Sequence, residues 1–136
     1  MTGVLLEVEL TALPWTRVAG GAQSGFEPGM GQKPTDATIE NEANNGLKND
    51  KYTVAMARTS APHSASSQFF INVAKNDFLN HTAPSMQGWG YAVFGKVISG
   101  MDVVSRIKQM PTGPGGPFPS DVPQTQVLIQ SATLVK

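Results

Sequence analysis

The sequence Gln-Phe-Phe-Ile-Asn-Val-Ala at residues 68–74 is rich in aromatic and β-branched side chains, which favour a β-strand. Two similar runs flank it in the chain, at residues 52–57 and 91–98. Pro62 interrupts the chain between the first two runs, as expected for a loop between strands. Three short strands joined by turn-forming segments predict an antiparallel sheet at the centre of the fold.

Two more strands are expected at the ends of the chain. In residues 3–10, apolar positions alternate with Glu7 and Glu9, which is the period-two pattern of a half-buried strand. Residues 127–135 are also predicted to form a strand, although the alternation breaks around Ser131. The predicted fold class is therefore mainly β.

The sequence predicts one clear helix, at residues 99–109, where apolar residues recur at helical spacing. Ser99 precedes Asp102 by three residues, which resembles a capping box. The glycine-rich residues 19–34 are expected to form a loop. Residues 111–123 contain five prolines and three glycines, so we expect a coil there.

Length and composition indicate one globular domain comprising residues 1–136. The chain has 136 residues, of which 40% are hydrophobic, enough for one ordinary core. Its formal net charge is +0, only 15% of residues are charged, and the bases are scattered. Nucleic acid and acidic membranes are therefore not expected as partners.

Several kinds of chemistry are disfavoured by the residues that are missing. The chain has no cysteine, which excludes disulfides, thiolate metal sites and thiol nucleophiles. His63 and His81 are the two histidines, and their spacing does not predict a metal site. No apolar run approaches the ~20 residues that span a bilayer, and Glu7 and Glu9 interrupt what would be the apolar core of a signal peptide. Neither a membrane location nor export is expected.

A series of sequence blocks points to a known family. The blocks are Gly-Phe-Glu-Pro-Gly-Met at residues 25–30, Asn-Glu-Ala-Asn-Asn-Gly-Leu-Lys-Asn at 41–49, Met-Ala-Arg-Thr at 56–59, Gln-Phe-Phe-Ile-Asn at 68–72, Gln-Gly-Trp-Gly-Tyr at 87–91 and Val-Phe-Gly-Lys-Val at 93–97. In this order they closely resemble the cyclophilin family of peptidyl-prolyl isomerases, in its bacterial cytoplasmic form. The resemblance covers residues 25–134, whereas residues 1–24 diverge.

The resemblance implies an antiparallel β-barrel of about eight strands capped by two helices, with the active groove on its outside. The N-terminal divergence leaves open whether that barrel is complete. It further implies catalysis of rotation about Xaa-Pro bonds, whose barrier is ~18–20 kcal/mol. That reaction needs no covalent step and no cofactor. An apolar pocket for the proline ring and a hydrogen-bond donor to the proline nitrogen suffice.

Matching the family motifs position by position implies the site residues. Gln68 matches the groove glutamine, and Phe70 matches the aromatic wall of the proline pocket. Ala57, Arg58 and Thr59 match the stretch that bonds the substrate backbone. The remaining pocket positions are Phe78, Leu79 and Tyr91, of which Phe78 stands where many eukaryotic members have a tryptophan, and Tyr91 where they have a histidine.

Each assignment competes with a simpler interpretation. Phe70 and Leu79 are also expected of an ordinary core, because alternate positions of a strand face inward. Arg58 is also expected of a solvated loop.

The catalytic arginine of the family has no certain counterpart. Trp15-Thr16-Arg17-Val18 is one candidate for a remnant of the arginine motif, with Gln23 as its glutamine, although the pocket phenylalanine and methionine of that motif are missing. Alternatively, residues 3–10 echo the family's second strand and residues 13–18 echo the start of the following helix. Under the first alternative, Arg17 is the expected catalytic donor.

Three hypotheses remain open: an active isomerase that assists cytoplasmic folding, a proline-peptide binding module with little turnover, and a damaged member that folds poorly. The third would expose residues 127–135 as an apolar edge if their neighbouring strand were lost. The expected partners are proline-containing peptides and unfolded proteins. Cyclosporin-type ligands are expected to bind weakly, because Phe78 replaces the tryptophan.

Overall fold

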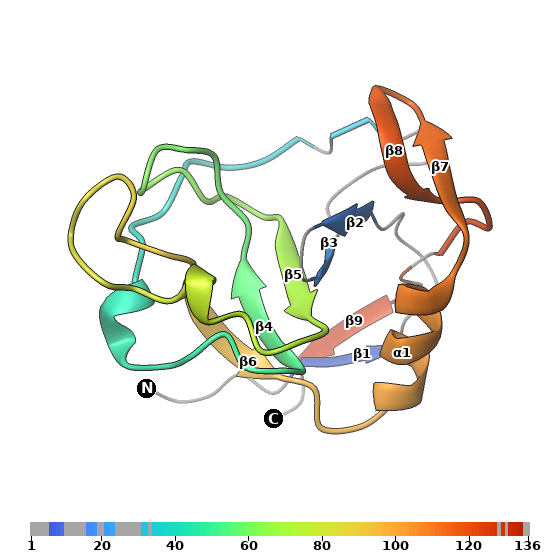
Figure 1. The fold of residues 1–136 in the computed structure, drawn as a ribbon, viewed down its shortest axis with the longest axis horizontal. Helices are drawn as coiled ribbons and strands as arrows, with labels where there is room; N and C mark the ends of the chain where they lie inside the picture. The colour runs from blue at the N-terminus through green and yellow to red at the C-terminus, as the bar shows by residue number, and fades with distance from the viewer. Residues whose placement is uncertain are drawn as a thin grey trace.

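The computed structural model describes residues 6–9, 16–18, 21–23, 31–32, 34–127, 129 and 131–134. Its central sheet has five strands, each antiparallel to its neighbours (Figure 1). Their spatial order is β2 (Thr16–Val18), β3 (Gly21–Gln23), β5 (Phe69–Asn72), β4 (Thr53–Met56) and β6 (Val93–Lys96). The three strands predicted from the middle of the sequence are thus confirmed, each shorter than expected.

The two predicted terminal strands are confirmed and pair with each other. β1 (Leu6–Glu9) is antiparallel to β9 (Ser131–Leu134), with Leu6 opposite Leu134. They lie side by side in Figure 1, in blue and red. The edge of β9 therefore has a partner along these four residues, and the exposed edge expected of a damaged member is not found there.

The sequence predicted a loop for the glycine-rich residues 19–34, but part of this segment forms a strand. Residues 21–23 form β3, which lies between β2 and β5. Residues 16–18 form β2, so the helical alternative for this stretch is wrong over these residues. Local propensity did not predict a strand at residues 21–23, and pairing with the backbone of β5 holds them in strand form.

The prediction of a coil at residues 111–123 is also wrong. This segment forms a hairpin of β7 (Thr112–Gly115) and β8 (Phe118–Pro123). A two-stranded sheet consists only of edge strands, where prolines without an N–H are tolerated. Gly115 is required at its position, because an added Cβ would lie 2.8 Å from a methyl carbon of Val122.

The predicted helix is confirmed as α1 (Met101–Gln109), but its expected capping box is absent. The chain enters α1 through Gly100 with φ of 78°, and this residue rather than Ser99 occupies the cap position without a side-chain hydrogen bond. Asp102 does not reach back, since its carboxylate pairs with Arg106 at 3.4 Å. Two short 3-10 helices complete the described elements, η1 (Ala43–Asn45) and η2 (Asp77–Leu79).

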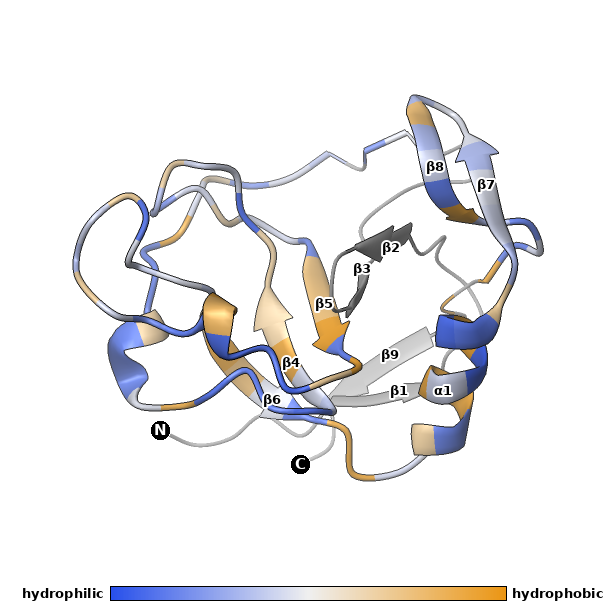
Figure 2. Ribbon diagram, in the orientation of Figure 1, coloured by the Kyte–Doolittle hydropathy of each residue, from blue (hydrophilic) through white to orange (hydrophobic). Residues whose placement is uncertain are grey.

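Alternate residues of β5 enter two different apolar clusters. Ile71 belongs to a buried cluster with Val104 and Ile107 of α1. Phe70 belongs to a second cluster with Ala55 and Val93. Figure 2 shows β5 as a largely apolar strand and α1 as a helix of mixed polarity. The alternation of side chains along a strand thus commits Ile71 to the helix-covered core and Phe70 to the opposite face of the sheet.

Candidate active site

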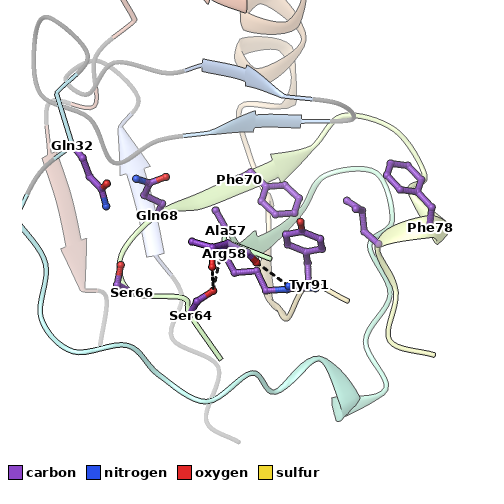
Figure 3. Close-up of a pocket in the computed structure, with 11 residues that line it drawn as sticks. Gln32, Ala57, Arg58, Ser64, Ser66, Gln68, Phe70, Phe78 and Tyr91 are labelled. Carbon is purple, nitrogen blue, oxygen red and sulfur yellow. Dashed lines mark hydrogen bonds between the residues drawn. The ribbon is translucent and has the colours of Figure 1, made fainter. Parts of the chain in front are cut away.

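A cavity of about 500 Å³ lies on the Phe70 side of the sheet. The residues that line it come from β5, from η2 and from three connecting segments: Gln32, Ala57, Arg58, Thr59, Ser64, Ser66, Gln68, Phe70, Phe78, Leu79 and Tyr91. In Figure 3 the aromatic side chains gather at one end of the cavity and the amides of Gln32 and Gln68 at the other. The cavity therefore has an apolar end and a polar end.

The apolar end is built on an aromatic pair. The rings of Phe70 and Tyr91 meet edge to face, with centroids 5.7 Å apart and planes inclined by 78°. Leu79 packs against the same cluster, while Phe78 remains 72% exposed at the rim. Phe70 is only 4% exposed, so it is both a core residue and a wall of the cavity. The two interpretations of Phe70 are therefore compatible.

Hydroxyl groups organise the polar end. The backbone N–H and the hydroxyl of Thr59 each donate to Ser64 Oγ at 2.9 Å. Ser64 in turn donates to the carbonyl oxygen of Ala61 at 2.6 Å. These bonds fix the loop that follows β4, and the cavity can thereby present polar groups to a peptide backbone.

Arg58 lies between the two ends and is the single charged residue among the described ones that line the cavity. Its guanidinium carbon lies 4.6 Å from the centroid of the Tyr91 ring. Nε donates to the carbonyl oxygen of Gly90 at 2.9 Å, and Nη1 donates to that of Thr59 at 2.9 Å. Arg58 is thus a half-buried loop residue whose guanidinium is hydrogen-bonded to backbone carbonyls.

Buried asparagines form hydrogen bonds to the segments that carry the cavity residues. The Asn49 amide nitrogen donates to the carbonyl oxygen of Leu79 at 3.1 Å, and Asn49 receives a hydrogen bond from Asn72 at 3.0 Å. Asn41 donates to the carbonyl oxygen of Gly90 at 3.0 Å. Buried amides are tolerated when they are hydrogen-bonded, and here they tie loops to the sheet.

The position of Arg17 is described only by its backbone. In β2, Arg17 pairs with Ala22, which in turn pairs with Ile71 of β5. Gln23 pairs with Phe70 instead. Directly paired residues of neighbouring strands share a face of the sheet, so Arg17 occupies the row of Ile71 and Gln23 the row of Phe70.

Among the described side chains, all those that the resemblance implied line the cavity, whereas the side chains of Arg17 and Gln23 lie outside the described part of the chain. Sequence reasoning missed Gln32, Ser64 and Ser66. The alternation of Ser64, Ala65 and Ser66 just before β5 is a signal for two hydroxyls on one side of an extended segment. No local pattern indicates Gln32, because it reaches the cavity only through the fold.

Three further observations concern metal binding, membrane-spanning helices and the titration of a tyrosine outside the cavity. Within the described ranges, histidine, aspartate and glutamate side chains form no group of three that could hold a metal ion. No helix in the described part of the chain has the length and apolar character needed to cross a bilayer. Outside the cavity, the hydrogen bond between Tyr52 and Ser105 lowers the pKa of Tyr52.

The chain is similar to several known proteins. Peptidyl-prolyl cis-trans isomerase B of Escherichia coli (strain K12) is 61% identical over 110 residues, which cover 81% of this chain and 66% of that protein. Peptidyl-prolyl cis-trans isomerase cyp18 of Streptomyces antibioticus is 59% identical over 111 residues, which cover 82% of this chain and 66% of that protein. The chain thus spans just under two thirds of the length of these relatives.

A solved structure supports the fold. The crystal structure of a Cryptosporidium parvum cyclophilin type peptidyl-prolyl cis-trans isomerase, in the presence of the dipeptide Ala-Pro, aligns with a TM-score of 0.66. The alignment covers 95% of this chain and 77% of that one, at 21% sequence identity.

The family assignment rests on most of the chain. Residues 12–134 match the family described as "Cyclophilin type peptidyl-prolyl cis-trans isomerase/CLD". The sequence blocks, the antiparallel sheet and the aromatic cavity all agree with this match. The chain therefore belongs to the cyclophilin-type peptidyl-prolyl cis-trans isomerase family.

Proposed function

We propose that this chain accelerates cis-trans rotation of Xaa-Pro peptide bonds in proteins that are folding. The observation that carries the proposal is the cavity itself, in which the aromatic wall of Phe70 and Tyr91 lies beside the polar groups of Gln68 and Thr59. A pyrrolidine ring fits the apolar end, while the polar end can bind the flanking peptide backbone. The Ala-Pro dipeptide present with the Cryptosporidium relative is of the same chemical class.

Rotation about the peptide bond requires no bond to be broken. The planar amide is stabilised by resonance, and its rotation barrier is ~18–20 kcal/mol. An apolar wall that holds the ring while the preceding carbonyl turns favours the twisted amide. A donor placed near the proline nitrogen would stabilise it further, because the twisted nitrogen has a localised lone pair.

Each site residue has a proposed role. Phe70, Phe78, Leu79 and Tyr91 enclose the proline ring, whereas Gln68 and residues 57–59 orient the peptide. We keep Arg17 as the proposed donor, since Arg58 matches a different position of the family motifs and Arg106 pairs with Asp102 on α1.

The register of β2 favours a second candidate function. Because Arg17 pairs in the row of Ile71 rather than in that of Phe70, a module that binds proline peptides with little turnover is the alternative. The two candidates differ in turnover but not in binding.

One experiment separates the candidates. A short Ala-Pro peptide is titrated with the protein, and the exchange between its cis and trans forms is followed by NMR. An isomerase binds the peptide and speeds the exchange, whereas a binding module shifts the resonances without speeding it. A peptide whose resonances and exchange rate both stay unchanged would refute both candidates.

We further propose a cytoplasmic location, on the resemblance to the bacterial cytoplasmic form, and weak binding of cyclosporin-type ligands. The second proposal rests on Phe78, whose exposed ring stands at the position of the tryptophan of many eukaryotic members. Cell fractionation tests the first proposal, and a ligand titration of the parent against Phe78→Trp tests the second.

A further inference from the structure

Arg58 is a cation held in one place at the centre of the cavity. Its Nε donates to Gly90, and its Nη1 donates to Thr59 and, at 3.3 Å, to the carbonyl oxygen of Ser60. The ring of Tyr91 supports the guanidinium at 4.6 Å. Because these contacts already restrict the side chain, little further conformational entropy is lost when it binds a ligand.

The guanidinium retains donors for such a ligand. It carries five N–H groups, and the three carbonyl bonds use those of Nε and Nη1. The described residues place no acceptor within hydrogen-bond distance of Nη2. Two N–H groups in the fixed geometry of the guanidinium are therefore available.

The positive charge of Arg58 also lacks a carboxylate partner within the described residues. The two ion pairs found among them join Lys75 to Asp77 and Arg106 to Asp102. Backbone carbonyls are neutral acceptors, so they leave the charge of Arg58 uncompensated. Since no other described residue that lines the cavity is charged, the cavity carries a net positive charge.

The charge lies close to the proposed proline site. Tyr91 contacts the Arg58 guanidinium with its ring and also meets Phe70 edge to face. Arg58 therefore contacts one of the two rings of the pocket wall directly. A peptide whose proline lies against Phe70 brings its neighbouring side chains within reach of Arg58.

We propose that Arg58 determines specificity, and that the cavity selects proline peptides with an aspartate or glutamate side chain within two residues of the proline. This inference rests on the proposed peptide binding. A carboxylate can accept two parallel hydrogen bonds from a guanidinium, which adds orientation to the attraction between the charges.

The test compares capped Ala-Pro peptides that carry Glu, Gln or Lys at each of the two positions on either side of the Ala-Pro pair. Affinity is measured by NMR titration or calorimetry, in low salt and in about 1 M salt, where charges are screened over ~3 Å. At the best position, we expect the Glu peptide to bind about fivefold more tightly than the Gln peptide. The Lys peptide should bind most weakly, and high salt should remove the differences.

Two variants test whether the preference for the Glu peptide depends on Arg58. In Arg58→Gln the ratio between the Glu and Gln affinities should fall to about one. In Arg106→Gln, which removes one positive charge from the exposed face of α1, the ratio should remain at the parent value. Because the ratio is taken within each variant, a general loss of affinity cancels. If the unsubstituted protein is an active isomerase, the preference for Glu should appear in KM rather than in kcat. The contact between the flanking side chain and Arg58 is the same in the planar and the twisted amide.

The outcomes separate this inference from the proposed function. If the Gln peptides bind and the Glu peptides bind no better in low salt, the inference is wrong while peptide binding stands. A preference that persists in Arg58→Gln also overturns it. If no peptide binds, both the proposed function and the inference fail. The comparison of peptides and of salt in the parent decides the matter even if Arg58→Gln does not fold.

Discussion

The side-chain amide nitrogen of Asn49 lies 3.2 Å from the carbonyl oxygen of Tyr91, 42 positions later in the sequence. The same nitrogen donates to the carbonyl oxygen of Leu79 at 3.1 Å. Asn49 is 1% exposed, and both bonds are partly buried. One buried amide thereby joins the two segments that supply Leu79 and Tyr91 to the cavity.

Removing this amide should destabilise the fold. Asn49→Ala removes the side-chain donor to the carbonyl oxygen of Tyr91, while the carbonyl oxygen of Leu79 keeps the backbone N–H of Tyr91 at 2.9 Å. A polar group that loses its partner on burial costs about 1–3 kcal/mol, so we expect the free energy of unfolding to fall by about 1–3 kcal/mol in urea denaturation. The exposed Asn44 provides the control, because Asn44→Ala should change stability by less than about 0.5 kcal/mol. Equal losses in the two variants would contradict a structural role for Asn49.

Gly90 should tolerate no side chain. Its φ is +71°, and an added Cβ would lie 2.6 Å from the carbonyl oxygen of Leu79. Gly90→Ala should therefore displace the segment that holds Tyr91 and weaken peptide binding. Gly46 is the matched control, because its φ is +83° but nothing lies within 4 Å of an added Cβ. Gly46→Ala should cost only the backbone strain, about 1 kcal/mol. Equal thermal stability of the two variants would contradict the steric argument.

Phe78 should contribute to binding with little effect on stability. Because it is 72% exposed, Phe78→Ala removes few contacts within the folded protein. A bound proline peptide would cover this ring, so we expect affinity to fall about fivefold. Phe94, which is 46% exposed on β6 and does not line the cavity, provides the comparison. If Phe94→Ala weakens binding as much as Phe78→Ala, the rim of the binding site has been misplaced.

The sequence predicted the elements whose signal is local. β4, β5 and β6 were predicted from their aromatic and β-branched residues and α1 from its apolar periodicity, and the family blocks implied most residues of the cavity. β3 could not be predicted, because Gly21–Gln23 has no apolar pattern and gains its strand form by pairing with residues 70–72. The hairpin at residues 112–123 was hidden by its prolines. Asn49 is indistinguishable in sequence from the asparagines that form turns, and only the fold shows that it is buried.

The last prediction concerns the proposed donor, Arg17. Arg17→Ala should lower the rate of isomerisation, on the order of a hundredfold if it supplies the donor, while the dissociation constant of an Ala-Pro peptide stays nearly unchanged. The reason is that a donor to the proline nitrogen acts on the twisted amide and not on the planar one. Arg106→Ala is the control for loss of one positive charge, and it should keep the parent rate.

The register of β2 and β3 suggests a second residue, Gln23, to compare with Arg17. Arg17 lies in the row of Ile71, whereas Gln23 lies in the row of Phe70, which lines the cavity. NMR exchange spectroscopy on the same peptide should therefore compare Arg17→Ala with Gln23→Ala. A loss of rate in Arg17→Ala alone supports the proposed donor. An undiminished rate in Arg17→Ala together with a loss in Gln23→Ala would show that the polar group acting on the substrate belongs to the row of Phe70, and that Arg17 has no part in the reaction.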